Sequence, residues 1–193
     1  MKTRLRALML AAALAAAPAL AAKDVAGISF EDKTKVGSAE LSLNGAGLRT
    51  RAFFKVYAMG LYLPEKKAAA DAVLGLKGAK RIQIVTLRDL SAQQFADALI
   101  EQLHKNLNES ELAALNPSIE EFKATLLSIG SAPNGTAIFI DYLPESGTQL
   151  SVNRQPKGKA IAGEAFYQAL LRIWLGAKPA QDDLKEALLG KSS

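Results

Sequence analysis

The chain has 193 residues, no cysteine, one histidine and a formal net charge of +5. The lack of cysteine excludes disulfides, thiol catalysis, iron–sulfur clusters and cysteine-ligated zinc, and one histidine supplies a metal site poorly. We therefore expect no metal and no cofactor. The charges are interspersed and three of the basic residues fall within the first six positions, so no nucleic-acid partner is expected.

Residues 1–21 have the pattern of a secretory signal peptide. A basic start is followed by an apolar run over 7–17 and by the small-residue pattern of a cleavage site, Pro-Ala-Leu-Ala. The run is shorter than the roughly 18–20 residues that span a bilayer, so no permanent membrane anchor is expected. We predict cleavage after Ala21, or after Ala22, and a periplasmic location. The remaining domain, 22–193, carries a net charge of about +2 and is long enough to bury one core.

The first half of this domain is predicted to be rich in strands. Strands are expected at 25–30 and 39–43, with a polar turn over 31–37 between them. Residues 52–63 are apolar on both parities except at Lys55, which is typical of a strand covered on both faces. A short helix at 66–74 and a strand at 81–87 are expected to follow.

The second half is predicted to be mainly helical. Capping patterns at Ser91, Asn108 and Ser118 each predict the start of a helix, the first running to about residue 107 and the last ending at Gly130. The further expectations are a hairpin of strands 136–143 and 148–152, a turn at 155–158, and helices at 163–175 and 180–189. This order predicts a single α+β domain.

Arg49 and Tyr57 share strand parity and would face the same side of an extended chain. Three other residues share that parity, namely Arg51, Phe53 and Lys55, so the pairing is not unique. An arginine beside a tyrosine hydroxyl can hold a carboxylate or another oxyanion, because both groups donate hydrogen bonds. The alternative is an ion pair between Arg49 and a nearby glutamate, with Tyr57 in the core.

Two neighbouring segments carry a family resemblance. The sequence GAGLR at 45–49, followed by FKVYAMGLYL at 54–63, resembles the chalcone isomerase superfamily, and within it the bacterial chalcone isomerase-like group, whose members are commonly exported. Weaker likeness continues at 90–95, 135–152 and 160–176. The resemblance implies an open-faced β-sandwich, in which a large antiparallel sheet has helices layered against it.

The resemblance also implies roles for individual residues. Arg49 matches the arginine that positions the substrate and stabilises its oxyanion, and Tyr57 stands where the isomerase has its active-site threonine. Phe95 replaces the catalytic tyrosine, and Gln102 replaces an asparagine. Phe95 can neither donate a hydrogen bond nor relay a proton, which argues against isomerase activity. An arginine followed by a tyrosine is also found in plant fatty-acid-binding relatives, where the pair clamps a carboxylate.

The function predicted from these residues is noncatalytic binding of a small amphipathic anion, such as a fatty acid. The expected ligand-binding residues are Arg49, Tyr57, Phe95 and Gln102, and no residue is assigned as catalytic. We expect the apolar part of the cleft to contain Phe53, Met59, Phe95 and Leu99. Trp174 is expected to serve in packing.

Three alternatives remain. The protein could be an intramolecular lyase of the isomerase type, or a structural or assembly factor of the envelope. It could also bind haem through His104 and a tyrosinate, Tyr57 or Tyr62, although His104 is expected on a solvated helix face. The ligand's identity, protein partners and oligomeric state are left open.

Overall fold

The computed structural model describes residues 22–191. The predicted signal peptide, 1–21, lies outside the described residues, so cleavage and export stay predictions. None of the helices in the described part of the chain is long and apolar enough to cross a membrane.

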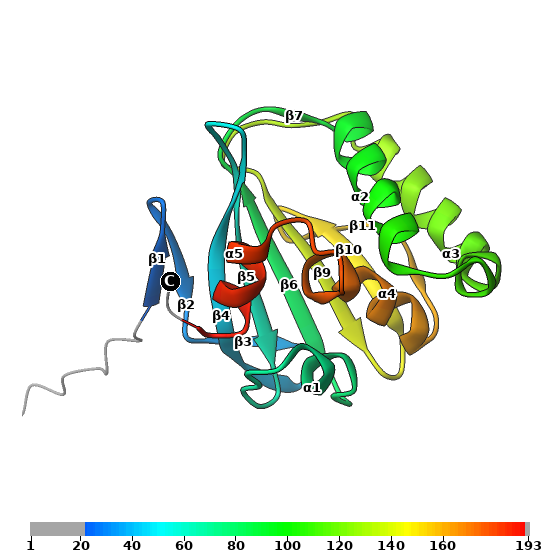
Figure 1. The fold of residues 1–193 in the computed structure, drawn as a ribbon, viewed down its shortest axis with the longest axis horizontal. Coiled ribbons are helices and arrows are strands. Elements are labelled where there is room, and N and C mark those ends of the chain that lie inside the picture. Colours follow the sequence, from blue (N-terminus) through cyan, green and yellow to red (C-terminus); the bar gives the residue numbers. More distant parts are fainter. Residues whose placement is uncertain (1–21, 192–193) are drawn as a thin grey trace, which may run out of the picture.

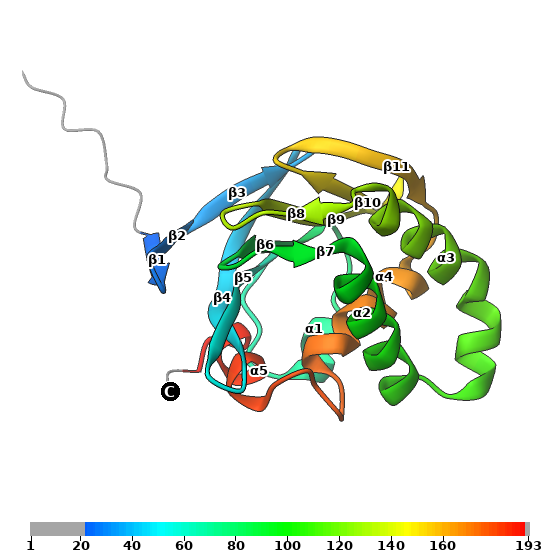
Figure 2. The same ribbon diagram turned by 90° about the horizontal axis from the view of Figure 1, so that it is seen from above.

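The fold is built on one curled sheet of seven antiparallel strands (Figures 1 and 2). Its spatial order is β11-β10-β9-β6-β5-β4-β3. The bounds are β3 (Lys33–Val36), β4 (Ala39–Arg51), β5 (Phe54–Leu63), β6 (Lys80–Thr86), β9 (Ala137–Leu143), β10 (Gly147–Val152) and β11 (Gln155–Ile161). Two small ribbons pair separately, β1 (Ala22–Val25) with β2 (Ile28–Glu31) and β7 (Leu90–Ser91) with β8 (Ser131–Ala132).

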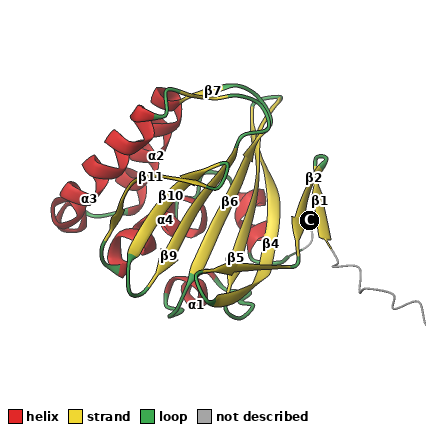
Figure 3. Ribbon diagram, turned by 180° about the vertical axis from the view of Figure 1, so that it is seen from behind, coloured by secondary structure: helices red, strands yellow, loops and turns green. Residues whose placement is uncertain are grey.

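The helices lie on one side of the sheet, and the opposite side is free of them (Figure 3). They are α1 (Ala70–Leu74), α2 (Ala92–Asn106), α3 (Glu109–Ser128), α4 (Glu164–Leu175) and α5 (Asp182–Leu188). This arrangement confirms the predicted α+β class, with a large antiparallel sheet and helices layered against it.

Strand β5 is covered on both faces from Tyr57 to Leu63, as the apolar run predicted. On the helical face, Met59 and Leu61 join the main hydrophobic core with α2, α3 and α4. On the other face, Tyr62 packs with Phe30 of β2 in a second cluster. Alternate residues of a strand point to opposite faces, so one strand serves two cores.

The glycines of the GAGLR segment allow α5 to approach β4 closely. A Cβ atom on Gly45 would lie 2.1 Å from the carbonyl oxygen of Ala187, and one on Gly47 would lie 2.7 Å from the Cβ of Ala187. Neither position can accept a side chain unless α5 moves. The segment therefore fixes how closely α5 packs on β4, and this matters for Arg49 below.

Several predicted boundaries in the second half of the chain are wrong. The capping boxes at Ser91 and Asn108 are confirmed by reciprocal hydrogen bonds, but Ser118 starts no helix, because α3 continues through Pro117. The predicted turn at 155–158 belongs to β11. The chain instead turns at Asn153 and Arg154, both with positive φ, and Pro156 is tolerated because β11 is an edge strand.

Three corrections fall in the first half. The predicted turn over 31–37 contains β3, and the helix predicted at 66–74 is reduced to α1. The third matters more: β4 runs on to Arg51, and the chain reverses at Ala52, whose φ is 52°. The segment from Arg49 to Tyr57 is thus a hairpin and not one extended strand.

Candidate ligand-binding site

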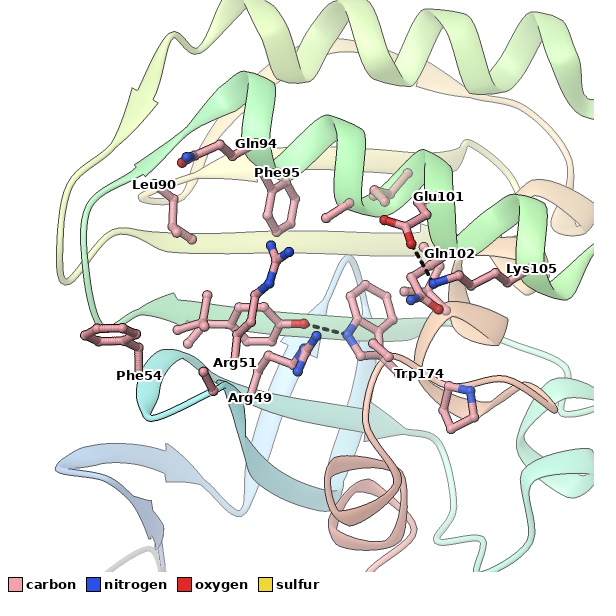
Figure 4. Close-up of a pocket in the computed structure, with 18 of the residues that line it drawn as sticks. Arg49, Arg51, Phe54, Leu90, Gln94, Phe95, Glu101, Gln102, Lys105 and Trp174 are labelled. Atoms are coloured by element: carbon pink, nitrogen blue, oxygen red, sulfur yellow. Dashed lines mark hydrogen bonds and ion pairs between the residues drawn. The ribbon is translucent and has the colours of Figure 1, made fainter.

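A cavity of about 780 Å³ opens between the β4–β5 hairpin, α2 and the end of α4 with the loop that follows it (Figure 4). Its apolar wall comes from Val56 of β5, Phe95 and Leu99 of α2, and Ile173 and Trp174 of α4. All four sequence-predicted ligand residues line this cavity.

The hairpin places Arg49 and Tyr57 directly opposite each other. They are partners in the antiparallel register of β4 and β5, one step before a bulge between Arg49 and Thr50. The two side chains were predicted to share a face of one strand. They do reach the same cavity, but as cross-strand neighbours, whose Cβ atoms normally lie about 4.5–5.5 Å apart.

The Tyr57 hydroxyl is buried and accepts a hydrogen bond of 2.9 Å from Nε1 of Trp174. Burial raises the pKa of Tyr57 above its usual value, and this outweighs the opposing effects of the Trp174 hydrogen bond and of the Arg49 charge. The hydroxyl therefore keeps its proton at neutral pH. Since residues 22–191 supply no acceptor for that proton, Tyr57 is left as a donor facing the cavity.

Arg49 is half-buried and held by neutral groups. Its guanidinium donates to the Thr50 carbonyl and, at 3.2 Å, to Oε1 of Gln181. Gln181 stands at the start of α5 and also accepts from the Thr50 amide at 2.9 Å. No carboxylate pairs with Arg49 within the described residues, so the alternative of an ion pair with glutamate is not supported.

The rim of the cavity is strongly basic. Besides Arg49, four further cations line it, and they are Arg51, Arg88, Lys105 and Lys178. Glu101 is the one acidic residue among the lining residues, and its carboxylate is paired with Lys105 at 2.6 Å. Charges of one sign around a cleft attract ligands of the other sign, so the cavity favours an anion.

Helix α2 supplies the two remaining predicted residues. Phe95 and Gln102 are seven residues apart and therefore lie on the same face, two turns from each other. Phe95 is half-buried and presents its ring to the cavity (Figure 4). Oε1 of Gln102 is buried and finds no hydrogen-bond partner among residues 22–191, so it is free to accept from a ligand.

Other expectations about the site are wrong. Phe53 is fully exposed at the hairpin tip, and Met59 is buried in the core, so neither lines the cavity. The expectation for His104 is confirmed, since it is exposed on α2, and it does not line the cavity. Burial raises the pKa of Tyr57, and that of Tyr62 to about 12, so neither is a tyrosinate at neutral pH.

Two functional side chains were missed. Trp174 was expected to pack, yet it lines the cavity and holds the Tyr57 hydroxyl, and Gln181 positions Arg49. The sequence could have indicated the role of Trp174, because the indole N–H of a buried tryptophan needs a hydrogen-bond acceptor. The sequence carries no signal for the second, since its role depends on where α5 docks.

A curled antiparallel sheet with helices on one face, enclosing a cavity with a cationic rim, defines an open-faced α+β sandwich with a cleft. The chain belongs to the chalcone isomerase-like family, whose sequence model matches residues 22–190. Its fold is similar to the crystal structure of a fatty-acid binding protein from Arabidopsis thaliana, with a TM-score of 0.65 and 17% identity over 84% of this chain and 92% of that one. A comparison with curated protein sequences finds no match.

Proposed function

We propose that this protein binds a small amphipathic anion, of the fatty-acid type, without transforming it. One observation carries the proposal: Arg49 and Tyr57 face each other across two strands at a cavity of about 780 Å³, and residues 22–191 supply no carboxylate for either. Both groups donate, and an arginine next to a neutral tyrosine is suited to hold one carboxylate. The volume falls within the roughly 300–1,000 Å³ of typical ligand sites.

The wall of the cavity suits the rest of such a ligand. Val56, Leu99 and Ile173 offer aliphatic contacts, and Phe95 adds an aromatic face where a catalytic hydroxyl would otherwise stand. Gln102 adds an unpaired acceptor, which would favour an acid that carries a hydroxyl along its chain. The shared fold with a protein described as fatty-acid binding supports this ligand class.

The direct test is a binding titration followed by the fluorescence of Trp174, the chain's single tryptophan, which lines the cavity. A saturated C16 acid should bind and change the emission, and the alcohol of the same length should bind more weakly. Equal affinities for acid and alcohol would show that the cationic end of the cavity does not recognise the carboxylate.

Isomerase activity is the second candidate, favoured by the retention of Arg49 at the cavity. Its test is the rate at which a chalcone cyclises in the presence of the protein and of its Arg49→Ala variant. Because Phe95 supplies no proton relay, we expect equal rates. A faster rate with the unchanged protein would establish the enzyme.

We further propose that the protein acts in the periplasm, on the basis of the signal pattern in residues 1–21. The intact mass of the protein from a periplasmic fraction tests this. A mass that begins at Ala22 or Lys23 is expected, and an uncleaved chain in the cytoplasm would contradict it.

A further inference from the structure

The tip of the β4–β5 hairpin exposes two adjacent phenylalanines. Phe53 is 100% exposed and Phe54 61%, and among the described residues only one other large apolar side chain, Leu127 at 37%, is comparably exposed. A single exposed apolar side chain needs no explanation. Two neighbours on one projecting turn form an apolar point, where Phe53 is fully exposed and Phe54 keeps most of its surface open.

This tip is also basic and free of acids. No aspartate or glutamate occurs between Glu40 and Glu65, whereas Arg51 and Lys55 flank the two phenylalanines. Arg88, from the loop after β6, stacks over Phe54 with its Cζ 5.1 Å from the ring centre.

Two acidic residues are connected to the tip, Asp89 next to Arg88 in sequence and Glu101 through Arg51, and both are engaged by other groups. Asp89 accepts a hydrogen bond of 2.8 Å from the amide of Asn134, and Glu101 is paired with Lys105. Arg51 lies near enough to Glu101 to act on its carboxylate, but the ion pair of that carboxylate is with Lys105. The tip therefore presents a positive surface around exposed aromatic rings.

We infer that the hairpin tip, residues 51–55 together with Arg88, docks on an anionic phospholipid bilayer. Aromatic rings enter the interface between headgroups and acyl chains, while arginine and lysine reach the phosphates, so this combination fits a membrane surface. The charge of the tip selects anionic lipids over neutral ones. An anionic bilayer offers phosphates for the cations and an apolar layer for the rings at one surface.

Docking in this way would bring the cavity to the membrane. Arg51, Ala52, Phe54 and Arg88 belong both to the tip and to the cavity lining, so the tip and the rim are contiguous. An amphipathic acid could then pass between the bilayer and the cavity without crossing water. This consequence rests on the proposed function, whereas the docking itself does not.

The experiment measures how much protein sediments with vesicles, with no fatty acid added. The chain beginning at Ala22 is used, since both hydrophobic clusters lie within the described residues and the signal pattern would itself bind lipid. Vesicles of equimolar phosphatidylglycerol and phosphatidylcholine are compared with phosphatidylcholine alone. We expect binding to the anionic vesicles only, weakened by salt.

Matched variants locate the contact. Phe53→Ser should lower the partition coefficient about tenfold, and Lys55→Gln about fivefold. The same changes elsewhere, Leu127→Ser on α3 and Lys159→Gln on β11, should have no effect, because α3 and β11 are other elements than the hairpin of β4 and β5 (Figure 1).

Three results would overturn the inference: no sedimentation with anionic vesicles, equal sedimentation with neutral ones, or equal losses in Phe53→Ser and Leu127→Ser. No sedimentation with anionic vesicles would mean that the tip does not bind a membrane and would favour a protein partner. Either of the other two results would mean that the tip does not direct binding. Since no acid is present, failure here is separate from failure of the titration with Trp174.

Discussion

Replacing Arg49 by methionine separates a ligand-binding role from a structural one. The side chain donates to Thr50 and Gln181, but Oε1 of Gln181 keeps its hydrogen bond from the Thr50 amide when Arg49 is gone. Methionine can fill the same half-buried space. We therefore expect the free energy of unfolding to fall by no more than about 2 kcal/mol, because the two half-exposed hydrogen bonds that Arg49 donates contribute about 1 kcal/mol each.

The affinity for an acid should change far more. A hydrogen bond to a charged group contributes about 1.5–3 kcal/mol, which corresponds to a rise in Kd of roughly 10–150-fold. The loss should be confined to the acid, because the alcohol of the same chain length offers Arg49 no charge. The titration that follows Trp174 measures both ligands, and urea unfolding measures stability.

Arg154→Met is the matched control, since Arg154 is exposed in the β10–β11 turn and does not line the cavity. It should leave the Kd of both ligands unchanged. The reasoning fails if Arg49→Met weakens acid and alcohol equally, or if it lowers stability by several kcal/mol while acid binding survives. Either result would make Arg49 a structural residue.

Three further predictions concern the aromatic residues. Tyr57→Phe removes the acceptor of the buried Trp174 N–H and should cost about 1–3 kcal/mol in urea unfolding, and an unchanged midpoint would contradict that hydrogen bond. Phe95→Ala should cost only about 1–2 kcal/mol, below the 3–5 of a fully packed ring, because Phe95 faces the cavity, and a larger loss would mean that the cavity is closed there. Burial raises the pKa of Tyr62 from 10.0 to about 12, so its stabilising effect is complete below pH 10 and is lost as the pH rises toward 12. Urea midpoints measured from pH 9 to 12 should therefore fall less in Tyr62→Phe than in the unchanged protein, and parallel curves would refute this.

The sequence predicted the fold class because its strongest local signals agree with the tertiary structure. The apolar run of β5 packs on both faces, and the capping boxes at Ser91 and Asn108 begin α2 and α3. The reversal at Ala52 was missed because it contains no glycine, proline or asparagine, the residues that normally mark a turn. Parity alone could not reveal that Arg49 faces Tyr57 across a hairpin.

The candidate site was predicted only in part, because some of its residues are positioned by long-range packing. Arg49, Tyr57, Phe95 and Gln102 came from a family resemblance, and the structure brings all of them to one cavity. Gln181 escaped notice because it acts only once α5 has docked on the glycines of β4. Positions set by long-range packing leave no periodic mark in the local sequence.

The central claim is that the cavity holds an amphipathic anion through Arg49. Native mass spectrometry of the protein purified from its own cells, followed by denaturing extraction, tests it most directly. The account predicts an added mass that the extract identifies as a small acid, and its loss from Arg49→Met. A protein with no added mass, which takes up nothing from a lipid extract, would contradict the claim.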